Sequence, residues 1–148
     1  MTKKIIVEKS DNVGHIRLNQ PEKHNAISFE MWQGMAEALD DFVSDDAIRV
    51  IVLSGEGGRA FSAGADISQF EEKRGSTAAV ETYNATMAQA SQKLTQIAKP
   101  TIAKITGYCI GGGLATALSC DLRIASDDSQ FGIPAAKLGL GYGYGALK

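Results

Sequence analysis

Three consecutive glycines, Gly111, Gly112 and Gly113, stand where a short apolar strand gives way to a run of small helix-forming residues. The strand is predicted over residues 101–106, and Gly107 allows a sharp turn after it. The first N–H groups of a helix have no internal partner, and the helix dipole places positive charge beside them. Because glycine lets a ligand atom approach the backbone, this stretch could hold a developing oxyanion. Alternatively, the glycines could serve only close packing of the helix against the strand.

A second glycine-rich stretch precedes the sequence AFSAGADI at residues 60–67. Its small residues and Gly64 predict a strand that ends in a tight turn with accessible backbone N–H groups. Asp66 is expected to cap a short helix over residues 67–72. The chain therefore has two places where backbone donors could face a ligand.

Other familiar arrangements of catalytic or binding residues are absent from the sequence. There is no G-x-G-x-x-G fingerprint, no G-K-S/T of a phosphate-binding loop and no G-x-S-x-G nucleophile elbow. His15 and His24 do not form a metal pair, and His15 is expected to be structural. Cys109 and Cys120 make neither a disulfide framework nor a metal-ligand cluster, which fits free thiols in a reducing compartment.

Composition narrows the class of protein further. The net charge of -2 argues against a dedicated nucleic-acid binder, because such proteins carry a basic excess. The apolar run at residues 5–7 is too short for a signal peptide, and no later segment reaches the length of a membrane span. We expect a cytoplasmic protein with no membrane segment, folded as one domain over residues 1–148.

Hydrophobic spacing predicts alternating strands and helices, hence an α/β fold with a parallel sheet. A polar loop precedes the first helix, and Ser28 is its expected N-cap. A long crossover helix between two strands favours a right-handed βαβ unit. The predicted strands cover residues 5–9, 13–19, 49–54, 101–106 and 122–125, and the predicted helices cover residues 29–43 and 77–98.

Two of these stretches together resemble the signatures of the enoyl-CoA hydratase/isomerase (crotonase) superfamily. Residues 60–67 are similar to its first signature, and residues 102–122, with Gly107 and the three glycines, are similar to its second. Residues 21–27, PEKHNAI, are similar to its early loop that faces coenzyme A. The resemblance runs from about Ile5 to the last residue. It implies an α/β spiral of ββα repeats that lacks its carboxyl-terminal helical part.

The resemblance also implies a site for an acyl-CoA thioester, with coenzyme A as part of the substrate and no separate cofactor or metal. The backbone N–H groups of Ala65 and Gly112 would form an oxyanion hole for the thioester carbonyl. The remaining residues expected along coenzyme A or the substrate are Lys23, His24, Ala26, Ala63, Asp66, Ile67, Ser68, Gly111, Pro134 and Ala135. The implied activity is that of a lyase or isomerase of fatty acid metabolism.

Two positions depart from the pattern of the family's hydratases. Those enzymes carry one glutamate three residues after the central glycine and a second after the proline of a later loop. Here the two positions are Ala115 and Ala135. A positioned general acid or base contributes roughly 10²–10⁴-fold to a rate, so two-glutamate hydration should not be assigned to this chain.

Other protic groups could take over proton transfer in this chain. Tyr142 and Tyr144 are expected where the acyl pocket would lie, although packing alone would also explain them. Glu71 and Glu72 follow the first signature, although a solvated helix face would explain them as well. Three interpretations remain open: an enzyme with other acid and base groups, a CoA-thioester binding protein without turnover, and a structural or RNA-associated relative, which the acidic balance disfavours.

We expect the isolated chain to associate. Family members are normally longer, and the further part would hold helices that trimerise, giving a homotrimer or a dimer of trimers, and that cover coenzyme A. Without that part, apolar surface would be exposed. Sedimentation velocity is therefore expected to detect a multimer, and a clean, stable monomer would contradict this expectation.

Overall fold

The computed structural model describes residues 3–69, 77–139 and 141, and it begins with the predicted pair of strands. β1 (Ile5–Ser10) and β2 (Val13–Leu18) form an antiparallel hairpin. Alternate residues of β2 are buried, among them Ile16 and Leu18, because successive side chains of a strand point to opposite faces. This hairpin forms one side of the larger sheet.

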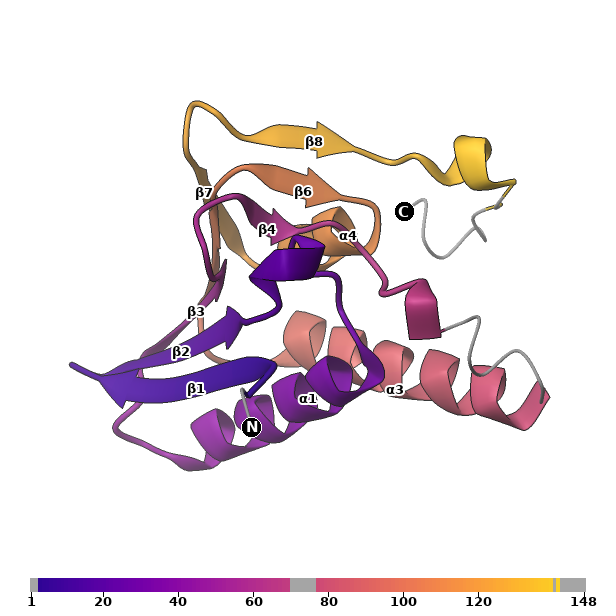
Figure 1. Cartoon of the computed structure of the whole chain (residues 1–148). Coiled ribbons are helices and arrows are strands. Elements are labelled where there is room, and N and C mark those ends of the chain that lie inside the picture. Colours follow the sequence, from indigo (N-terminus) through magenta and orange to yellow (C-terminus); the bar gives the residue numbers. More distant parts are fainter. Residues whose placement is uncertain (1–2, 70–76, 140, 142–148) are drawn as a thin grey trace.

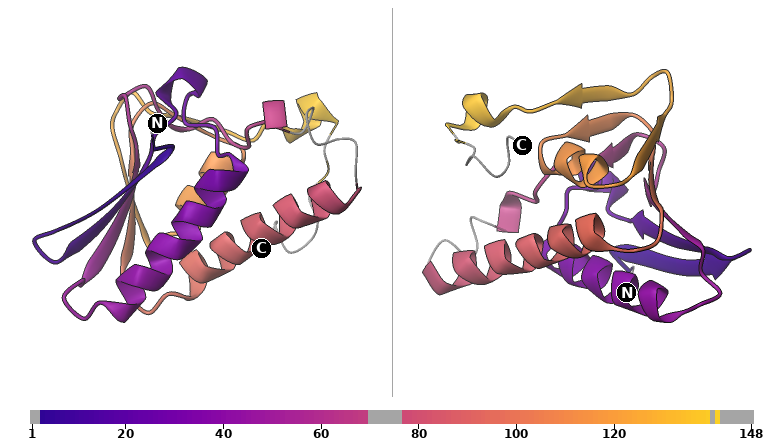
Figure 2. Two further views of the ribbon diagram at one scale, coloured as in Figure 1. Left: turned by 60° about the horizontal axis from the view of Figure 1, so that its bottom comes forward. Right: turned by 180° about the vertical axis from the view of Figure 1, so that it is seen from behind.

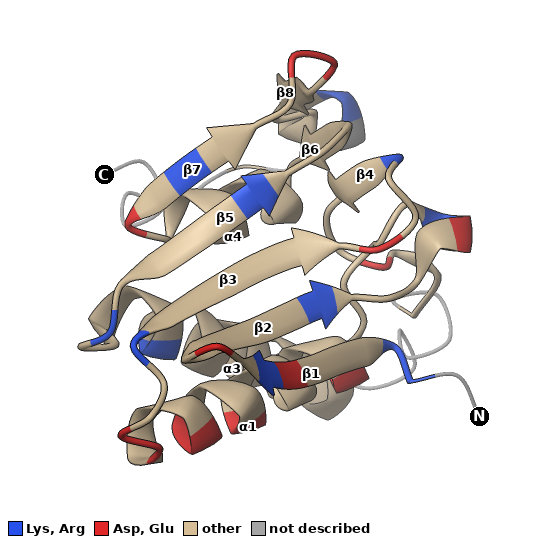
Figure 3. Ribbon diagram, turned by 90° about the vertical axis from the view of Figure 1, so that its left-hand side faces the viewer, with Lys and Arg blue, Asp and Glu red and all other residues tan. Residues whose placement is uncertain are grey.

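Three further strands extend the sheet in parallel from β2. They are β3 (Val50–Gly55), β5 (Thr101–Ile105) and β7 (Leu122–Ala125), and the strand order is β1-β2-β3-β5-β7. Figure 3 looks onto the outer face of this sheet, and both long helices lie behind it. The predicted parallel α/β architecture is confirmed.

Two long helices pack side by side on the inner face of the large sheet (Figures 1 and 2). α1 (Phe29–Ser44) begins at Ser28, whose Oγ accepts a hydrogen bond from the Met31 N–H at 3.3 Å, so the predicted N-cap is confirmed. α3 (Thr77–Gln96) buries Tyr83, Ala90 and Leu94, which recur at helical spacing. The core of the protein lies between these helices and the sheet.

A second, smaller sheet lies at the other end of the molecule, above α1 and α3 in Figure 1. It consists of β4 (Ala60–Ser62), β6 (Tyr108–Ile110) and β8 (Gln130–Gly132), all parallel. The chain visits the two sheets in turn, which adds one strand to each sheet per repeat. Short helices complete the fold: η1 (Pro21–Lys23), α4 (Gly112–Leu118) and η2 (Ala135–Leu138).

Two predicted connections were wrong. The strand that leads into the glycine helix is β6 and not the strand at residues 101–106, because Gly107, with φ +67°, turns the chain from the large sheet to the small one. Likewise, the later loop that carries Ala135, residues 130–136, contains β8 and the start of η2. Both missed strands have three residues, which is too short for an alternating pattern to emerge.

Gly113 allows α4 to lie directly against β4. A Cβ atom at this position would stand 2.5 Å from the Ser62 carbonyl oxygen and 2.7 Å from the Ser62 Cβ. Both distances lie below van der Waals contact, and Ser62 is itself buried. The predicted packing role of the glycines is therefore confirmed for Gly113.

Apolar side chains are exposed where each sheet ends. Leu122 and Ile124 on β7 and Phe131 on β8 are each more than half exposed, as are Leu118 and Ile133 nearby. β7 and β8 are the last strands of their sheets. The expected association of the isolated chain depends on exposed apolar surface of this kind. Separately, none of the helices in the described ranges is long and apolar enough to cross a membrane.

We predict that Gly113→Ala destabilises the fold. The added methyl group would meet the backbone of β4, and overpacking of this kind costs about 1–3 kcal/mol. The gain in helix propensity, at most about 1 kcal/mol, offsets only part of this cost. Urea denaturation would measure the change. Gly141→Ala is the control, because no atom of the described residues lies within 4 Å of a Cβ placed there, and an equal effect of the two substitutions would contradict the packing argument.

Candidate active site

Two backbone turns meet where β4 and β6 end. The first turn follows β4 and contains Gly64 and Ala65, and the second turn follows β6 and contains Gly111 and Gly112. Since these strands are parallel neighbours, their carboxyl ends lie at the same edge of the small sheet. Gly64 follows β4 with φ +104°, a conformation that favours glycine. A Cβ on Gly64 would stand 3.2 Å from the Ile110 carbonyl oxygen and 3.4 Å from the Gly112 nitrogen. The absence of a side chain at Gly64 thus lets the two turns approach each other.

Two adjacent N–H groups at this meeting point have no acceptor among the described residues: those of Ala65 and Gly112. A Cβ on Gly112 would lie only 3.6 Å from the Ala65 nitrogen. Three of the neighbouring donors are engaged. The Gly64 N–H donates to Ser62 Oγ at 3.1 Å, the Asp66 N–H to the Ile27 carbonyl at 3.1 Å and the Gly111 N–H to the Gly132 carbonyl at 2.8 Å.

The two roles suggested for the three glycines, close packing and presentation of an N–H group, therefore belong to different residues. Gly113 permits close packing, whereas Gly112 is the first residue of α4 and presents its N–H at the turn. Because α4 spans only seven residues, its contribution comes from local N–H groups and not from the dipole of a long helix. Such a pair of fixed donors suits an oxygen atom that gains negative charge.

The early loop lies along the first turn. The Ala63 N–H donates to the His24 carbonyl at 2.9 Å, and the Ile27 N–H donates to the Gly64 carbonyl at 2.7 Å. Ile27 and Ala65 form an isolated parallel bridge. The structure thus brings the predicted residues of the loop, Lys23, His24 and Ala26, next to those of residues 63–68.

Asp66 is a buried anchor between these two segments and more than a helix cap. Its side chain is 3% exposed. It accepts hydrogen bonds from Ser68 Oγ at 2.6 Å, from Lys23 Nζ at 3.1 Å and from Gln20 Nε2 at 3.1 Å, besides the capping bond from the Ser68 N–H. Burial opposes ionisation of this carboxyl, but the hydrogen bonds from Ser68, Lys23 and Gln20 outweigh it and hold its pKa below the ordinary value.

The outward side of this region remains accessible. Ile67 is 65% exposed, and Ala63 and Ser68 are exposed as well. The Lys23 side chain is 46% exposed although its ammonium group binds Asp66 and Ser68. His24 places its ring edge-on to the ring of Tyr108, with the centroids 5.8 Å apart. A ligand could therefore meet Ala63, Ile67, Ser68 and Lys23 from solvent.

The two positions without glutamate lie on elements that adjoin the second turn. Ala115 is exposed on α4, one helical turn after Gly112. Ala135 is the first residue of η2 and is 8% exposed, and Pro134 Cδ lies 4.0 Å from a Cβ placed on Gly111. Both side chains are methyl groups, so neither position supplies a proton donor or acceptor.

The other predicted proton-transfer residues, Tyr142, Tyr144, Glu71 and Glu72, lie outside the described residues, as does the second half of the predicted helix at residues 67–72. Cys109 and Cys120 are free and buried, and burial raises the pKa of each thiol to about 11. Neither is a thiolate near neutral pH. The described residues contain no group of histidine, cysteine and acidic side chains that could hold a metal ion.

The hydrophobic spacing that predicts the two long helices gives no sign of a polar contact beneath the first turn. Trp32 Nε1 donates to Tyr83 Oη at 3.1 Å, and Tyr83 Oη donates to the Ile27 carbonyl at 3.2 Å. The available signal was the hydroxyl group itself, because a buried tyrosine usually finds a hydrogen-bond partner.

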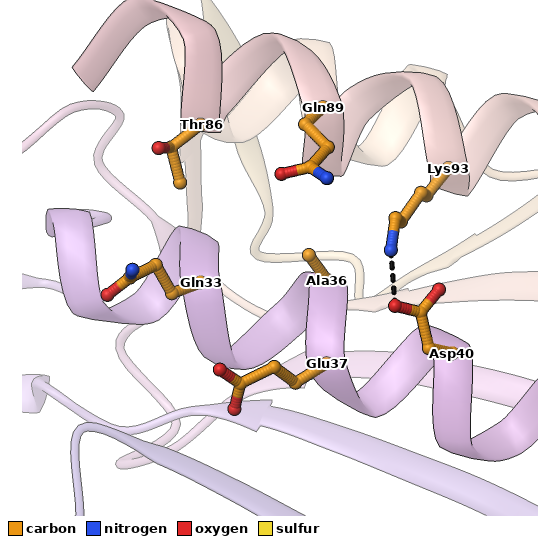
Figure 4. Close-up of a pocket in the computed structure, with 7 residues that line it drawn as sticks. All are labelled: Gln33, Ala36, Glu37, Asp40, Thr86, Gln89 and Lys93. Carbon is orange, nitrogen blue, oxygen red and sulfur yellow. Dashed lines mark hydrogen bonds and ion pairs between the residues drawn. The ribbon is translucent and has the colours of Figure 1, made fainter. Parts of the chain in front are cut away.

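A hollow elsewhere in the protein is unrelated to the two turns. It lies between α1 and α3, is lined mainly by polar side chains such as Gln33, Glu37 and Gln89, and is crossed by the Asp40–Lys93 ion pair (Figure 4). Neither helix carries the Ala65 or Gly112 donor, so this hollow is not part of the candidate active site.

Comparison with known proteins agrees with the resemblance seen in the sequence. The family model described as enoyl-CoA hydratase/isomerase matches residues 8–148. The short-chain-enoyl-CoA hydratase of Clostridium acetobutylicum is 33% identical over 144 residues, covering 97% of this chain and 54% of that protein. The 4-chlorobenzoyl coenzyme A dehalogenase-2 of an Arthrobacter species is 39% identical over 135 residues, covering 88% of this chain and 48% of that protein.

Solved structures match equally well. A crystal structure described as an enoyl-CoA hydratase/carnithine racemase from Magnetospirillum magneticum has a TM-score of 0.91 at 33% identity, covering 99% of this chain and 55% of that chain. The crotonase-like fold is thereby confirmed. The chain spans about half the length of the curated relatives that it matches.

We predict that Asp66→Asn destabilises the fold in a pH-dependent way. Because the pKa of Asp66 is lower in the folded protein, its carboxylate stabilises the fold above the ordinary pKa of about 3.9, and this stabilisation is lost as the pH falls below that value. The substitution should lower the free energy of unfolding by about 1.5–3 kcal/mol at pH 7. Urea titrations from neutral to acidic pH would detect the difference shrinking below about pH 4.

Asp40→Asn is the matched control for this experiment. Asp40 pairs with Lys93 on the surface and its side chain is 64% exposed, so its loss should cost at most about 1 kcal/mol. An Asp66→Asn effect that is equally small, or that persists unchanged at low pH, would contradict the anchoring role.

Proposed function

Because this chain belongs to the enoyl-CoA hydratase/isomerase family, we propose that it binds an acyl-CoA thioester and stabilises the thioester enolate with the N–H groups of Ala65 and Gly112. The observation that carries this proposal is the pair of adjacent donors without acceptors among the described residues. The N–H groups of Gly64, Asp66 and Gly111 beside them are engaged, whereas these two are available to a ligand.

The chemistry follows from the charge that the thioester oxygen acquires. When a base removes the α-proton, or when a nucleophile attacks the β-carbon, an electron pair moves onto the carbonyl oxygen. Two fixed N–H donors stabilise that negative charge without having to reorganise. Each donor of this kind is typically worth about 10²–10³ in rate, so the pair can supply a large part of a catalytic effect.

Coenzyme A is proposed to lie along the early loop and the first turn, on Lys23, His24 and Ala26 and on residues 63–68. The exposed side chains of Ala63, Ile67 and Ser68 and the half-exposed Lys23 support this position. Lys23 is held by Asp66, which keeps one ammonium group facing the loop surface, where the phosphates of coenzyme A could meet it. Gly111, Pro134 and Ala135 would border the acyl group.

The reaction is proposed to be enolate chemistry other than two-glutamate hydration, since Ala115 and Ala135 cannot transfer protons. Double-bond isomerisation, decarboxylation and thioester hydrolysis can all use one oxyanion hole. The names of the relatives, a hydratase and a dehalogenase, support the idea that this family's framework serves several reactions. The homotrimeric assembly, the role in fatty acid metabolism and the cytoplasmic location belong to the same proposal.

A second candidate function is binding of an acyl-CoA thioester without turnover. The observation that favours it is the methyl group at each position where the family's hydratases carry a glutamate. In that case the two donors would hold the ground-state carbonyl, and no proton would move. Proton exchange at the α-carbon separates the two candidates.

The test is mass spectrometry of crotonyl-CoA incubated with the protein in heavy water, with binding measured in the same sample. Gain of water would mean that another residue replaces the glutamates, and deuterium uptake alone would indicate isomerisation or related enolate chemistry. Binding without either change would favour the non-catalytic candidate for this acyl group, whereas absence of binding would contradict both.

Gly112→Pro tests the oxyanion hole directly. Proline is tolerated at the first position of a helix, where its missing N–H has no partner within the helix, so the substitution removes the donor and spares α4. We predict a loss of about 10²–10³ in any thioester turnover or deuterium exchange. Gly112→Ala keeps the N–H, and its methyl group would make an ordinary contact at 3.6 Å, so it should lose much less. Unchanged turnover in Gly112→Pro would exclude the oxyanion assignment.

A further inference from the structure

Three buried groups form a hydrogen-bonded chain that runs from the helices to the first turn. Trp32 Nε1 on α1 donates to Tyr83 Oη on α3 at 3.1 Å, and Tyr83 Oη donates to the Ile27 carbonyl at 3.2 Å. Trp32 and Ile27 are buried, and Tyr83 is only 4% exposed. Each group therefore depends on the others, because water cannot replace a lost partner at such a site.

Ile27 in turn holds both sides of Ala65. The Ile27 N–H donates to the Gly64 carbonyl at 2.7 Å, and the Ile27 carbonyl accepts from the Asp66 N–H at 3.1 Å. The Gly64 carbonyl and the Ala65 N–H belong to one planar peptide unit and point in opposite directions. Fixing the Gly64 carbonyl on Ile27 therefore aims the Ala65 N–H away from Ile27, toward Gly112.

We infer that Tyr83 is a positioning residue for the oxyanion hole: its hydroxyl group fixes the Ile27 carbonyl, and Ile27 fixes the peptide that carries the Ala65 N–H donor. This inference rests on the proposed function, because it concerns the donor that the proposed reaction uses. Tyr83 has no direct contact with the substrate in this role. It acts through the Ile27 carbonyl, which it shares with the Asp66 N–H.

The chemistry of Tyr83 suits a permanent donor. Burial raises the pKa of its hydroxyl, and the nearby charge of Asp66 raises it further, although the hydrogen bond from Trp32 works in the opposite direction. The group stays protonated near neutral pH and below. Phenylalanine would fill nearly the same volume but could neither donate to Ile27 nor accept from Trp32.

The geometry also separates this role from packing alone. Tyr83 belongs to α3, which is remote in sequence from both turns, yet its hydroxyl reaches the carbonyl of the residue that precedes the N-cap of α1. A core tyrosine that served only packing would not need to meet the one residue bridged to Ala65. Small displacements of a donor lower transition-state stabilisation steeply, so support of this kind has a measurable effect.

The test is the absorbance of bound 2,4-hexadienoyl-CoA, a conjugated thioester whose absorption moves to longer wavelength when its carbonyl is polarised. In the unchanged protein we expect a red shift on binding. In Tyr83→Phe the red shift should fall by roughly half or more, because one of two donors is misaligned. The dissociation constant of free coenzyme A, which has no thioester carbonyl, should stay within about twofold.

Two further variants separate the hydroxyl group from general effects. Thr86→Val removes a hydroxyl of α3 that bonds only to the Thr82 carbonyl of the same helix, and it should keep the full red shift. Replacing Tyr83 with 3-fluorotyrosine at pH 6 keeps a hydroxyl donor of greater strength and should retain or enlarge the shift. If Tyr83→Phe does not fold, the trend across fluorinated tyrosines takes its place.

The outcomes distinguish the inference from the proposed function. Loss of the red shift in Tyr83→Phe, with coenzyme A affinity and the far-ultraviolet circular dichroism spectrum unchanged, supports the positioning role. A full red shift in that variant, or no trend across fluorinated tyrosines, overturns the positioning role but leaves the hole intact. Absence of any red shift in the unchanged protein, despite binding, overturns the oxyanion hole itself and the positioning role with it.

Discussion

The close approach of two backbone turns is the constraint on which the rest of this structure depends. Gly64 and Gly112 come so near that a side chain on Gly64 would meet the backbone of the second turn. This contact requires β4 and β6 to be parallel neighbours and α4 to lie against Ser62. The alternation of the chain between two sheets supplies both conditions.

The surroundings of the two turns provide hydrogen-bond acceptors for the N–H groups on both sides of Ala65 and for the one before Gly112. Backbone N–H groups that lose water without gaining an acceptor are costly, so most are paired in folded proteins. Here Ser62, Ile27 and Gly132 each accept a hydrogen bond from a residue beside the two donors. Ala65 and Gly112 are themselves only partly buried, so water can solvate their N–H groups until a ligand arrives. Two donors thus stay open to a ligand at little cost to stability.

Much of the fold could be predicted from the sequence, because long elements carry a repeating pattern. α1 ends within one residue of its predicted boundary and α3 within two, and the Ser28 cap follows from local chemistry. The strands β6 and β8 could not be predicted, since three residues are too few to show a repeating pattern.

In the candidate site, the turns that hold Ala65 and Gly112 could be predicted from their glycines. The partners of Asp66 could not, because Gln20 and Lys23 lie more than forty residues away and spacing says nothing of such contacts.

The difference between backbone groups and side chains also bears on how this chain departs from the pattern of the family's hydratases. The donors of an oxyanion hole built from backbone N–H groups are present in every residue except proline, so a change of side chain at the donor position itself does not remove the N–H group. Proton transfer depends on side chains, and a single substitution can remove it. An alanine such as Ala115 or Ala135 in place of a glutamate has no group that transfers a proton. Electrostatic stabilisation and proton transfer are therefore separable in this fold. A chain can lose both carboxylates, each worth roughly 10²–10⁴ in rate, and still keep the donors that stabilise an enolate. New chemistry in such a framework needs only a new proton-transfer group within reach of the same two donors.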